Sequence, residues 1–242
     1  MHEGVHPVAE AGRGVVSDPA FDRYLDGLAG SWRGLAAPRP SAVVVESPGL
    51  LAMRHPDPVL VNAVLLTPQA LNVALELFEH SPTFAVWTHD DDTATAVAVR
   101  AAGLRPDITT RPMVLPAALP LPEAAGGVEL DVDPARVCRL NGVDPELLSG
   151  VPDLRCVATA DDTSGLAVQD VGDDVVLSFV ATRPEARGRG LASAVTAAAL
   201  RDAAERGLRG AVLQATPAAE RLYARLGFVA VGRWREWVRP GS

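Results

Sequence analysis

The chain of 242 residues contains no lysine and only two cysteines, and both scarcities exclude classes of protein. Without lysine there is no Gly-Lys-Ser/Thr segment, so a P-loop nucleotide site is excluded. The cysteines, Cys138 and Cys156, have neither a metal-ligand spacing nor a disulfide framework, and we expect a buried, reduced pair in a cytoplasmic protein. No apolar run reaches the length that spans a bilayer, and residues 1–17 lack the apolar core of a signal peptide. Neither a metal site nor membrane association is therefore expected.

Basic residues are also scarce in most of the chain. The formal net charge is −8. Residues 1–182 hold 11 arginines and 25 acidic residues, a balance of −14, whereas residues 183–242 hold 11 arginines and 5 acidic residues, a balance of +6. The overall acidity argues against a nucleic acid as the main partner. The arginine excess near the end of the chain favours a multiply anionic ligand there.

The start of this arginine-rich region, together with the residues just before it, predicts three successive elements: a strand, a glycine-rich turn and a helix. The apolar run 175–180 predicts a buried strand, and the alanine-rich segment 191–207, with Gly207 as its C-terminal stop, predicts a helix. Arg187-Gly188-Arg189-Gly190 lies between them. Because glycine lets the backbone approach a ligand closely and the first N–H groups of a helix lack internal partners, the segment predicts an anion site. A dinucleotide-binding G-x-G-x-x-G is excluded, since Ser193 stands where a third glycine would be.

Two segments of the second half resemble the signatures of one enzyme family. Residues 187–192, R-x-x-G-x-A, resemble the Q/R-x-x-G-x-G/A signature of the GNAT N-acetyltransferase superfamily. Residues 219–228, AERLYARLGF, are similar to its A-x-x-L-Y-x-x-L-G-F segment and follow in the family's order. The resemblance covers the end of the chain well and the rest loosely. It implies an α/β fold with a mixed sheet, the GNAT-like acyl-CoA-binding fold, for residues 128–242.

The first half repeats this organisation in weaker form. Residues 84–104 show the same order of strand, polar turn, alanine-rich helix and glycine, without the R-x-x-G-x-A turn. We interpret residues 18–120 as a degenerate GNAT-like domain that precedes the acetyltransferase domain at 128–242; the alternative is a chance likeness between two ordinary strand–helix segments. Residues 1–17 are expected to form a disordered leader, and the proline-rich run 116–127 a linker.

The resemblance also implies which residues hold acetyl-CoA. The backbone of Val180, Ala181 and Thr182 would pair with the pantetheine arm and offer an N–H to the thioester carbonyl. The pyrophosphate would be held by Arg187, Gly188, Arg189, Gly190, Leu191 and Ala192, with Ser193 close by. Thr216 stands where the family often has an asparagine, with Gln214 as a nearby substitute. Tyr223 is implied as the acid that protonates the leaving thiolate, and its alternative role is packing in the core.

One feature of the family is missing. The usual positions of its glutamate base fall on Val176 or Ser178, and neither side chain acts as a base at neutral pH. A base would have to come through water from Asp170 or Asp153, or from the N-terminal half, which holds all five histidines. The sequence thus predicts a monomeric or homodimeric N-acetyltransferase that acts on an amine of a small molecule or peptide. A non-catalytic acyl-CoA sensor is the alternative.

The remaining elements are predicted from periodicity and from cap and turn residues. Helices are expected at 19–36, 68–79, 92–102, 145–148 and 218–225. Strands are expected at 42–45, 59–66, 84–88, 109–115, 128–132, 154–160, 166–171, 211–214 and 228–238. Residues 46–58 are expected to form a loop.

Overall fold

The computed structural model describes residues 18–116 and 127–241. The predicted leader and most of the predicted linker lie outside the described residues. The helices are α1 (Pro19–Ala36), α2 (Ala70–Leu77), α3 (Thr93–Ala101), α4 (Pro134–Asn141), α5 (Leu191–Glu205) and α6 (Glu220–Arg225). The strands of the first half are β1 (Val43–Ser47), β2 (Leu50–Arg54), β3 (Asn62–Leu65), β4 (Ala85–His89) and β5 (Arg105–Leu115). Those of the second half are β6 (Val128–Glu129), β7 (Leu154–Thr159), β8 (Ser164–Val171), β9 (Asp174–Thr182), β10 (Gly210–Ala215), β11 (Val229–Ala230) and β12 (Trp234–Val238).

The described strands form one continuous mixed sheet. Its order is β1-β2-β3-β4-β12-β5-β10-β9-β8-β7-β6, and β11 also pairs with β5. Two neighbouring pairs, β3–β4 and β9–β10, are parallel, and the other pairs are antiparallel. Each parallel pair is joined by a helix, α2 in the first half and α5 in the second. The two halves of the chain therefore repeat one strand–helix–strand unit.

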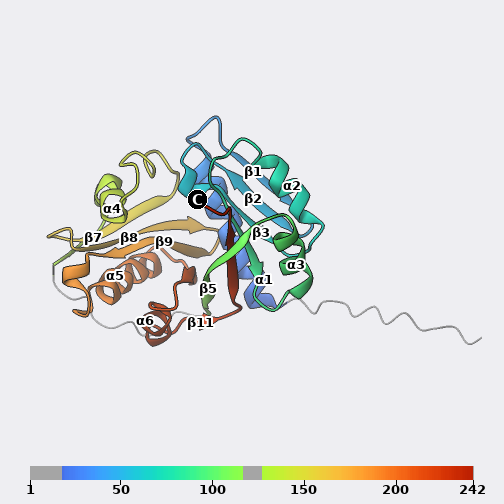
Figure 1. Ribbon diagram of the computed structural model, residues 1–242. Helices are drawn as coiled ribbons and strands as arrows, with labels where there is room; N and C mark the ends of the chain where they lie inside the picture. The colour runs from blue at the N-terminus through green and yellow to red at the C-terminus, as the bar shows by residue number, and fades with distance from the viewer. Residues whose placement is uncertain (1–17, 117–126, 242) are drawn as a thin grey trace, which may run out of the picture.

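The last strand of each half pairs with the other half. β5, from the first half, pairs with β10, and β12, the last strand of the chain, lies between β4 and β5. Figure 1 shows β12 in dark red beside the green β5. The predicted boundaries 18–120 and 128–242 thus divide the sequence without dividing the sheet, and as folding units they remain a prediction.

Two predictions in the regions around β2 and α4 are wrong. Residues 50–54 form a strand where a loop was expected, because Pro48-Gly49 makes a two-residue hairpin turn that returns the chain at once. Residues 145–148 form turns, and the helix lies earlier, at α4. The Asp133 carboxylate accepts the N–H of Ala135 at 2.9 Å and so caps the start of α4.

The single strand predicted at 228–238 is also wrong, since the structure has β11 and β12 there. Both strands pair with β5, β11 with Val114 and Met113 and β12 with residues 105–110. Pro112 lies between these two sections of β5 and has no N–H to donate to the ladder. The interruption of the final strand follows from this missing donor.

Helices cover both faces of the sheet (Figure 1). α1 and α4 share one core with residues from both halves, and Cys138 and Cys156, which were predicted to be buried, are part of it. On the other face α5 and α6 cover strands of the second half, and α2 and α3 cover strands of the first. Among the helices of residues 18–116 and 127–241, none is long and apolar enough to cross a membrane.

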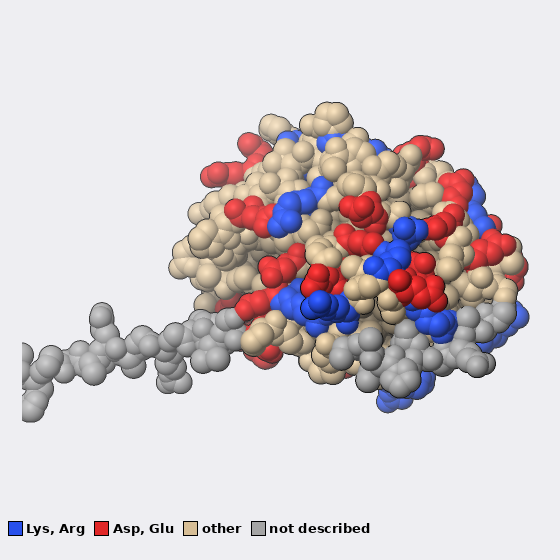
Figure 2. All heavy atoms as spheres, turned by 180° about the vertical axis from the view of Figure 1, so that it is seen from behind, with Lys and Arg blue, Asp and Glu red and all other residues tan. Residues whose placement is uncertain are grey.

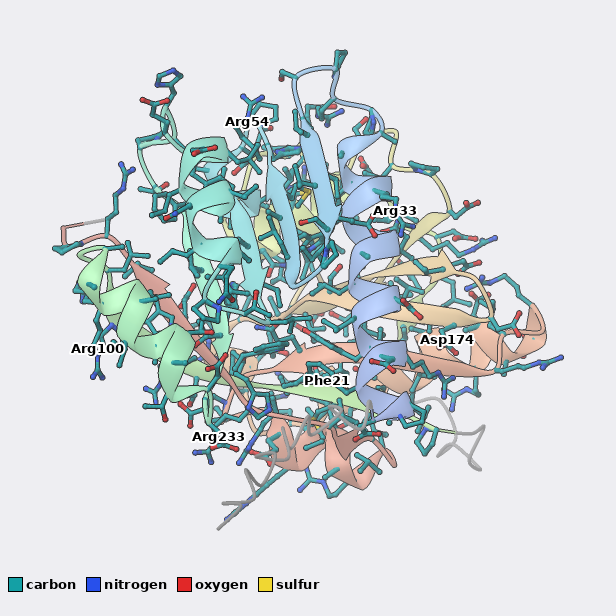
Figure 3. All side chains as sticks on the ribbon, turned by 90° about the vertical axis from the view of Figure 1, so that its right-hand side faces the viewer. Phe21, Arg33, Arg54, Arg100, Asp174 and Arg233 are labelled. Carbon is teal, nitrogen blue, oxygen red and sulfur yellow. The ribbon has the colours of Figure 1, made fainter. Side chains whose placement is uncertain are left out.

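α1 precedes the strands of the first half but packs closely on strands of the second. A Cβ atom at Gly30 would lie 2.2 Å from Cγ1 of Val171, and one at Gly27 would lie 2.6 Å from Cγ2 of Val212. The Arg23 guanidinium forms an ion pair with Asp174 at the start of β9. Figure 3 shows Asp174 beside the upright α1. The glycines of α1 thus permit a distance to the sheet that a larger residue would not.

We expect Gly30→Ala to lower the free energy of unfolding by about 1–2 kcal/mol. Alanine favours an exposed helix over glycine by about 1 kcal/mol, but overpacking costs about 1–3 kcal/mol, and here about 2–3 kcal/mol because the new Cβ would lie 2.2 Å from Cγ1 of Val171. Urea denaturation of both proteins measures the difference. Asp26→Ala, at an exposed position of the same helix, is the control and should be neutral or slightly stabilising. A Gly30→Ala protein as stable as the wild type would show that α1 is not held this closely.

Candidate functional site

The pairing between β9 and β10 ends part-way along β9. The parallel register joins residues 210–213 to residues 174–177, and β9 continues to Thr182 paired with β8 only. Phe179 has φ +50°, and the register of β9 against β8 shifts beside it, which is the pattern of a β-bulge. Residues 178–182 therefore have no strand partner on the β10 side. They are half-buried, whereas residues 174–177 are buried.

The bulge is held by Asn141, the last residue of α4. Its side-chain amide donates to the carbonyl of Val137 at 2.9 Å and to the carbonyl of Phe179 at 2.7 Å. The end of α4 is thereby fixed to β9 where the strand leaves its regular path. Asn141 was not predicted, because the helix that carries it, α4, was not predicted. Asp133-Pro134 before the helix and Gly142 after it are the start and stop signals that would have identified it.

The turn between β9 and α5 contains two glycines with positive φ. Gly188 has φ +75° and Gly190 has φ +78°, and a Cβ at either position would meet no atom within 4 Å. Conformation, and not crowding within the protein, requires glycine here. The first intrahelical bond runs from the N–H of Ala194 to the carbonyl of Gly190. The helix itself therefore offers no acceptor to the N–H groups of residues 191–193.

Two exposed arginines each directly precede one of these glycines. The Nε of Arg187 donates to the carbonyl of Thr182 at 3.3 Å, so its side chain turns back towards the end of β9. Arg189 is exposed as well. Unpaired N–H groups, the positive end of the helix dipole and guanidinium groups all attract anions. The structure thus brings residues 187–193 together with 180–182 at one end of β9.

Tyr223 lies on α6 within the core that α5 covers. It is 4% exposed, and its ring lies edge-on to Phe228 with 5.8 Å between centroids. Burial raises the pKa of Tyr223 to about 12, so the hydroxyl keeps its proton at neutral pH. No residue of the described chain forms a hydrogen bond with this hydroxyl. The side chain therefore packs in the core and keeps its proton, which no described residue accepts.

Thr216 and Gln214 have different surroundings. Thr216 is exposed, and its carbonyl accepts the N–H of Glu220 at 3.1 Å near the start of α6. The carboxamide of Gln214 accepts from the Tyr24 hydroxyl at 2.8 Å and donates to Thr110 at 2.7 Å. Gln214 is thus engaged with α1 and β5 on the face of the sheet opposite to Tyr223.

The two aspartates suggested as sources of a base lie on neighbouring segments beside the start of β9, whereas the bulge lies towards its other end. Asp170 pairs in register with Val175, near the start of β9, and its carboxylate forms an ion pair with Arg206. Asp153 directly precedes β7 at the same end of the sheet, and its carbonyl accepts the N–H of Asp170 at 3.0 Å. Neither position favours a role at residues 178–182.

The first half has a closed counterpart of this arrangement. Its parallel ladder between β3 and β4 continues to Leu65, the last residue of β3, so the two strands do not part. The helix that follows, α2, begins after Pro68-Gln69 without a glycine or a side-chain cap. The features that expose backbone groups in the second half are therefore missing from the corresponding described residues of the first.

Part of the second half matches a known protein family. Residues 153–228 match the Acetyltransferase (GNAT) family. Over this segment the chain is similar to GNAT domains. The segment spans β7 to Phe228 and includes both the bulge of β9 and the turn of Gly188 and Gly190.

Solved structures share the fold of nearly the whole chain. A GCN5-related N-acetyltransferase from Kribbella flavida is 21% identical, with a TM-score of 0.66, and the alignment covers 93% of this chain and 96% of that one. A GCN5-related N-acetyltransferase-like protein from Streptococcus suis is 16% identical, with a TM-score of 0.60, over 90% and 98% of the two chains. A comparison with curated protein sequences finds no match. The predicted mixed α/β, GNAT-like fold is confirmed, and so is the predicted family of the second half.

GNAT domains generally use acetyl-CoA, and the turn of this domain fits a pyrophosphate. The two left-handed glycines leave open space beside the first N–H groups of α5, and two exposed arginines stand next to them. Among the described residues no group of three or more His, Cys, Asp or Glu side chains is placed to hold a metal ion.

Proposed function

We propose that the protein is an N-acetyltransferase that transfers the acetyl group of acetyl-CoA to an amine of a small molecule or peptide in a ternary complex. One observation carries this proposal: the free edge of β9 beyond Leu177 and the open turn before α5 lie at the same end of the same strand. Acetyl-CoA has an extended arm that is followed by a pyrophosphate. It therefore requires a free strand edge that is followed by an anion-binding turn.

Residues 180–193 would hold the cofactor along its length. The free backbone edge at Val180, Ala181 and Thr182 offers N–H and C=O groups to the amide-containing arm. The N–H groups that follow Gly190, with Arg187 and Arg189, would bind the pyrophosphate. Ser193, half-buried in the first turn of α5, adds a hydroxyl close to these groups.

Acetyl-CoA supplies an activated acyl group, and the chain would stabilise the charges that develop during its transfer. A backbone N–H of the free β9 edge would donate to the carbonyl oxygen as negative charge builds on it. Tyr223 would donate its proton to the leaving sulfur, which its pKa of about 12 permits at neutral pH. The attacking amine must be neutral when it reacts, and the proton that its nitrogen loses as the amide forms would pass through water to the Tyr223 oxygen, which has given its own proton to the sulfur.

A non-catalytic acyl-CoA sensor is the second candidate, and a specific observation favours it. The two positions at which the family often carries a glutamate base are Val176, which is buried, and Ser178, which is half-buried. Cofactor binding needs neither of them, because it rests on residues 180–193. Binding without turnover is therefore the behaviour expected of a sensor.

Calorimetric titration with acetyl-CoA, followed by assays for free CoA thiol across a panel of amines, separates these functions. An acetyltransferase should bind acetyl-CoA with a Kd of about 1–100 μM and release thiol with at least one amine. Binding with no thiol release over the whole panel would favour the sensor. Folded protein that gives no heat at high micromolar acetyl-CoA would overturn both.

A further inference from the structure

A hollow of about 240 Å³ lies on the α4 side of the sheet, beside the end of β9. It is lined by Arg136, Arg139 and Leu140 of α4, by Asp162 of the β7–β8 turn and by Arg183. Arg183 directly follows the last residue of β9, and its backbone N–H donates to the carbonyl of Thr163 at 2.8 Å. The hollow is thus formed by three segments, and the backbones of two of them, Arg183 and the β7–β8 turn, are hydrogen-bonded to each other.

Arg136 is already neutralised and held in place. Its guanidinium donates to Asp162 at 2.6 Å, to Glu129 at 2.7 Å and to the carbonyl of Thr159 at 3.1 Å. These contacts tie α4 to the β7–β8 turn. Arg136 therefore forms a rigid wall of the hollow.

The other two guanidinium groups are not neutralised by any described residue. The side chains of Arg139 and Arg183 form no ion pair or hydrogen bond within the described residues, and both are exposed. On the face shown in Figure 2, basic and acidic groups lie side by side. Ion-paired arginines include Arg23, Arg33, Arg155, Arg206 and Arg235. Three arginines and one aspartate line the hollow, an excess of +2, and Glu129 outside it reduces this to +1.

The hollow and the glycine turn lie on opposite faces of the sheet. Val137 of α4 packs with Ala158 and Ala167, whereas α5 packs with Val157 and Leu166, and neighbouring residues of a strand point to opposite faces. Arg139 lies only two residues before Asn141, which holds the β9 bulge. A molecule in the hollow would therefore reach residues 178–182 from the side that the cofactor's pyrophosphate does not occupy.

We propose that this hollow binds an anionic group, a carboxylate or a phosphate, of the amine acceptor. The inference rests on the proposed function and narrows its substrate class to amines that carry an acidic group. Two unpaired guanidinium groups match a carboxylate or phosphate in charge and in geometry. Leu140 gives the hollow an apolar wall against which the stem of such an acceptor packs.

Calorimetry with matched amines tests the subsite without requiring turnover. Phosphoethanolamine is compared with ethanolamine, and β-alanine with ethylamine, each with and without free CoA. The wild type should bind the anionic member of each pair at least about tenfold more tightly, and the double variant Arg139→Gln/Arg183→Gln should lose this preference. Arg155→Gln is the control, because it removes one arginine of β7 that is already ion-paired with Asp131 and lies outside the hollow. It should keep the preference within about twofold.

Two results would overturn the subsite: a wild type that does not prefer the anionic amines, or a double variant that still does. A further titration compares CoA with 3′-dephospho-CoA, which lacks one phosphate. If the double variant binds CoA about tenfold more weakly than the wild type but 3′-dephospho-CoA equally well, the hollow holds the cofactor's own phosphate, and the assignment to the acceptor is wrong. Absence of acetyl-CoA binding or thiol release, with the preference for anionic amines intact, would reject the proposed function and not the subsite.

Discussion

Gly190→Val is expected to weaken acetyl-CoA binding by at least about 100-fold. Gly190 has φ +78°, where a β-branched residue is strained by about 1–3 kcal/mol. The turn would relax by rotating the N–H groups at the start of α5 away from the ligand, and each charge-assisted hydrogen bond lost costs about 1.5–3 kcal/mol. The new side chain would also occupy the open space in which no atom of the protein lies within 4 Å of the Cβ position. Loss of two such bonds gives the expected factor.

Gly207→Val is the matched control for this experiment. Gly207 follows the other end of α5, has φ +91°, and also has open space around the Cβ position. The substitution therefore adds the same backbone strain to the same helix, far from the proposed pyrophosphate position. It should lower the melting temperature while leaving the calorimetric Kd within about threefold of the wild type. Wild-type affinity in Gly190→Val would show that the turn does not bind the pyrophosphate.

The parts of the fold that were predicted correctly have their signals close together in the sequence. The start of α1 follows from Asp18-Pro19, and the Asp18 carboxylate accepts the N–H of Ala20 at 2.9 Å as a cap should. The end of β9, the glycine turn and the start of α5 lie within residues 182–191 and follow from Pro184 and the two glycines. Caps, turns and periodicity depend on interactions within a few residues, so sequence patterns report them.

The position of β12 depends on contacts that no local pattern reports. As a sequence, Trp234–Val238 predicts a strand that completes the second half, yet it lies between two strands of the first half. α1 gives a second example, because Gly27 and Gly30 weaken it as an isolated helix and become favourable only against Val212 and Val171. Partners more than a hundred residues away decide both cases.

The geometry of the candidate site was predicted only where the conformation of nearby backbone residues determines it. The turn of Gly188 and Gly190 was predicted, whereas the bulge at Phe179 was not, since a phenylalanine with φ +50° is held there by Asn141 from another element. The hollow of Arg139 and Arg183 was missed for the same reason. Side chains that meet only through tertiary packing leave no spacing in the sequence by which to recognise them.

Tyr223→Phe is expected to lower kcat by about 10- to 1000-fold and to change acetyl-CoA affinity by less than about tenfold. The substitution keeps the ring, its burial and its edge-on contact with Phe228, and removes only a hydroxyl that bonds to no described residue. Stability should therefore change little. A CoA thiolate formed near neutral pH leaves more easily with a proton donor in position, and burial keeps this donor protonated by raising its pKa to about 12. Single-turnover thiol release measures the chemical step.

The chain's other tyrosine provides the control. Tyr24 is equally buried, but its hydroxyl donates to Gln214 at 2.8 Å, so Tyr24→Phe leaves a buried acceptor unpaired and should cost about 1–2 kcal/mol of stability. Its kcat should stay within about threefold of the wild type, because its hydroxyl already has a protein partner. An unchanged single-turnover rate in Tyr223→Phe would remove the acid role. A Tyr223→Phe protein that fails to fold would instead assign Tyr223 to the core, since the ring alone would then not be sufficient to hold α6 against β10.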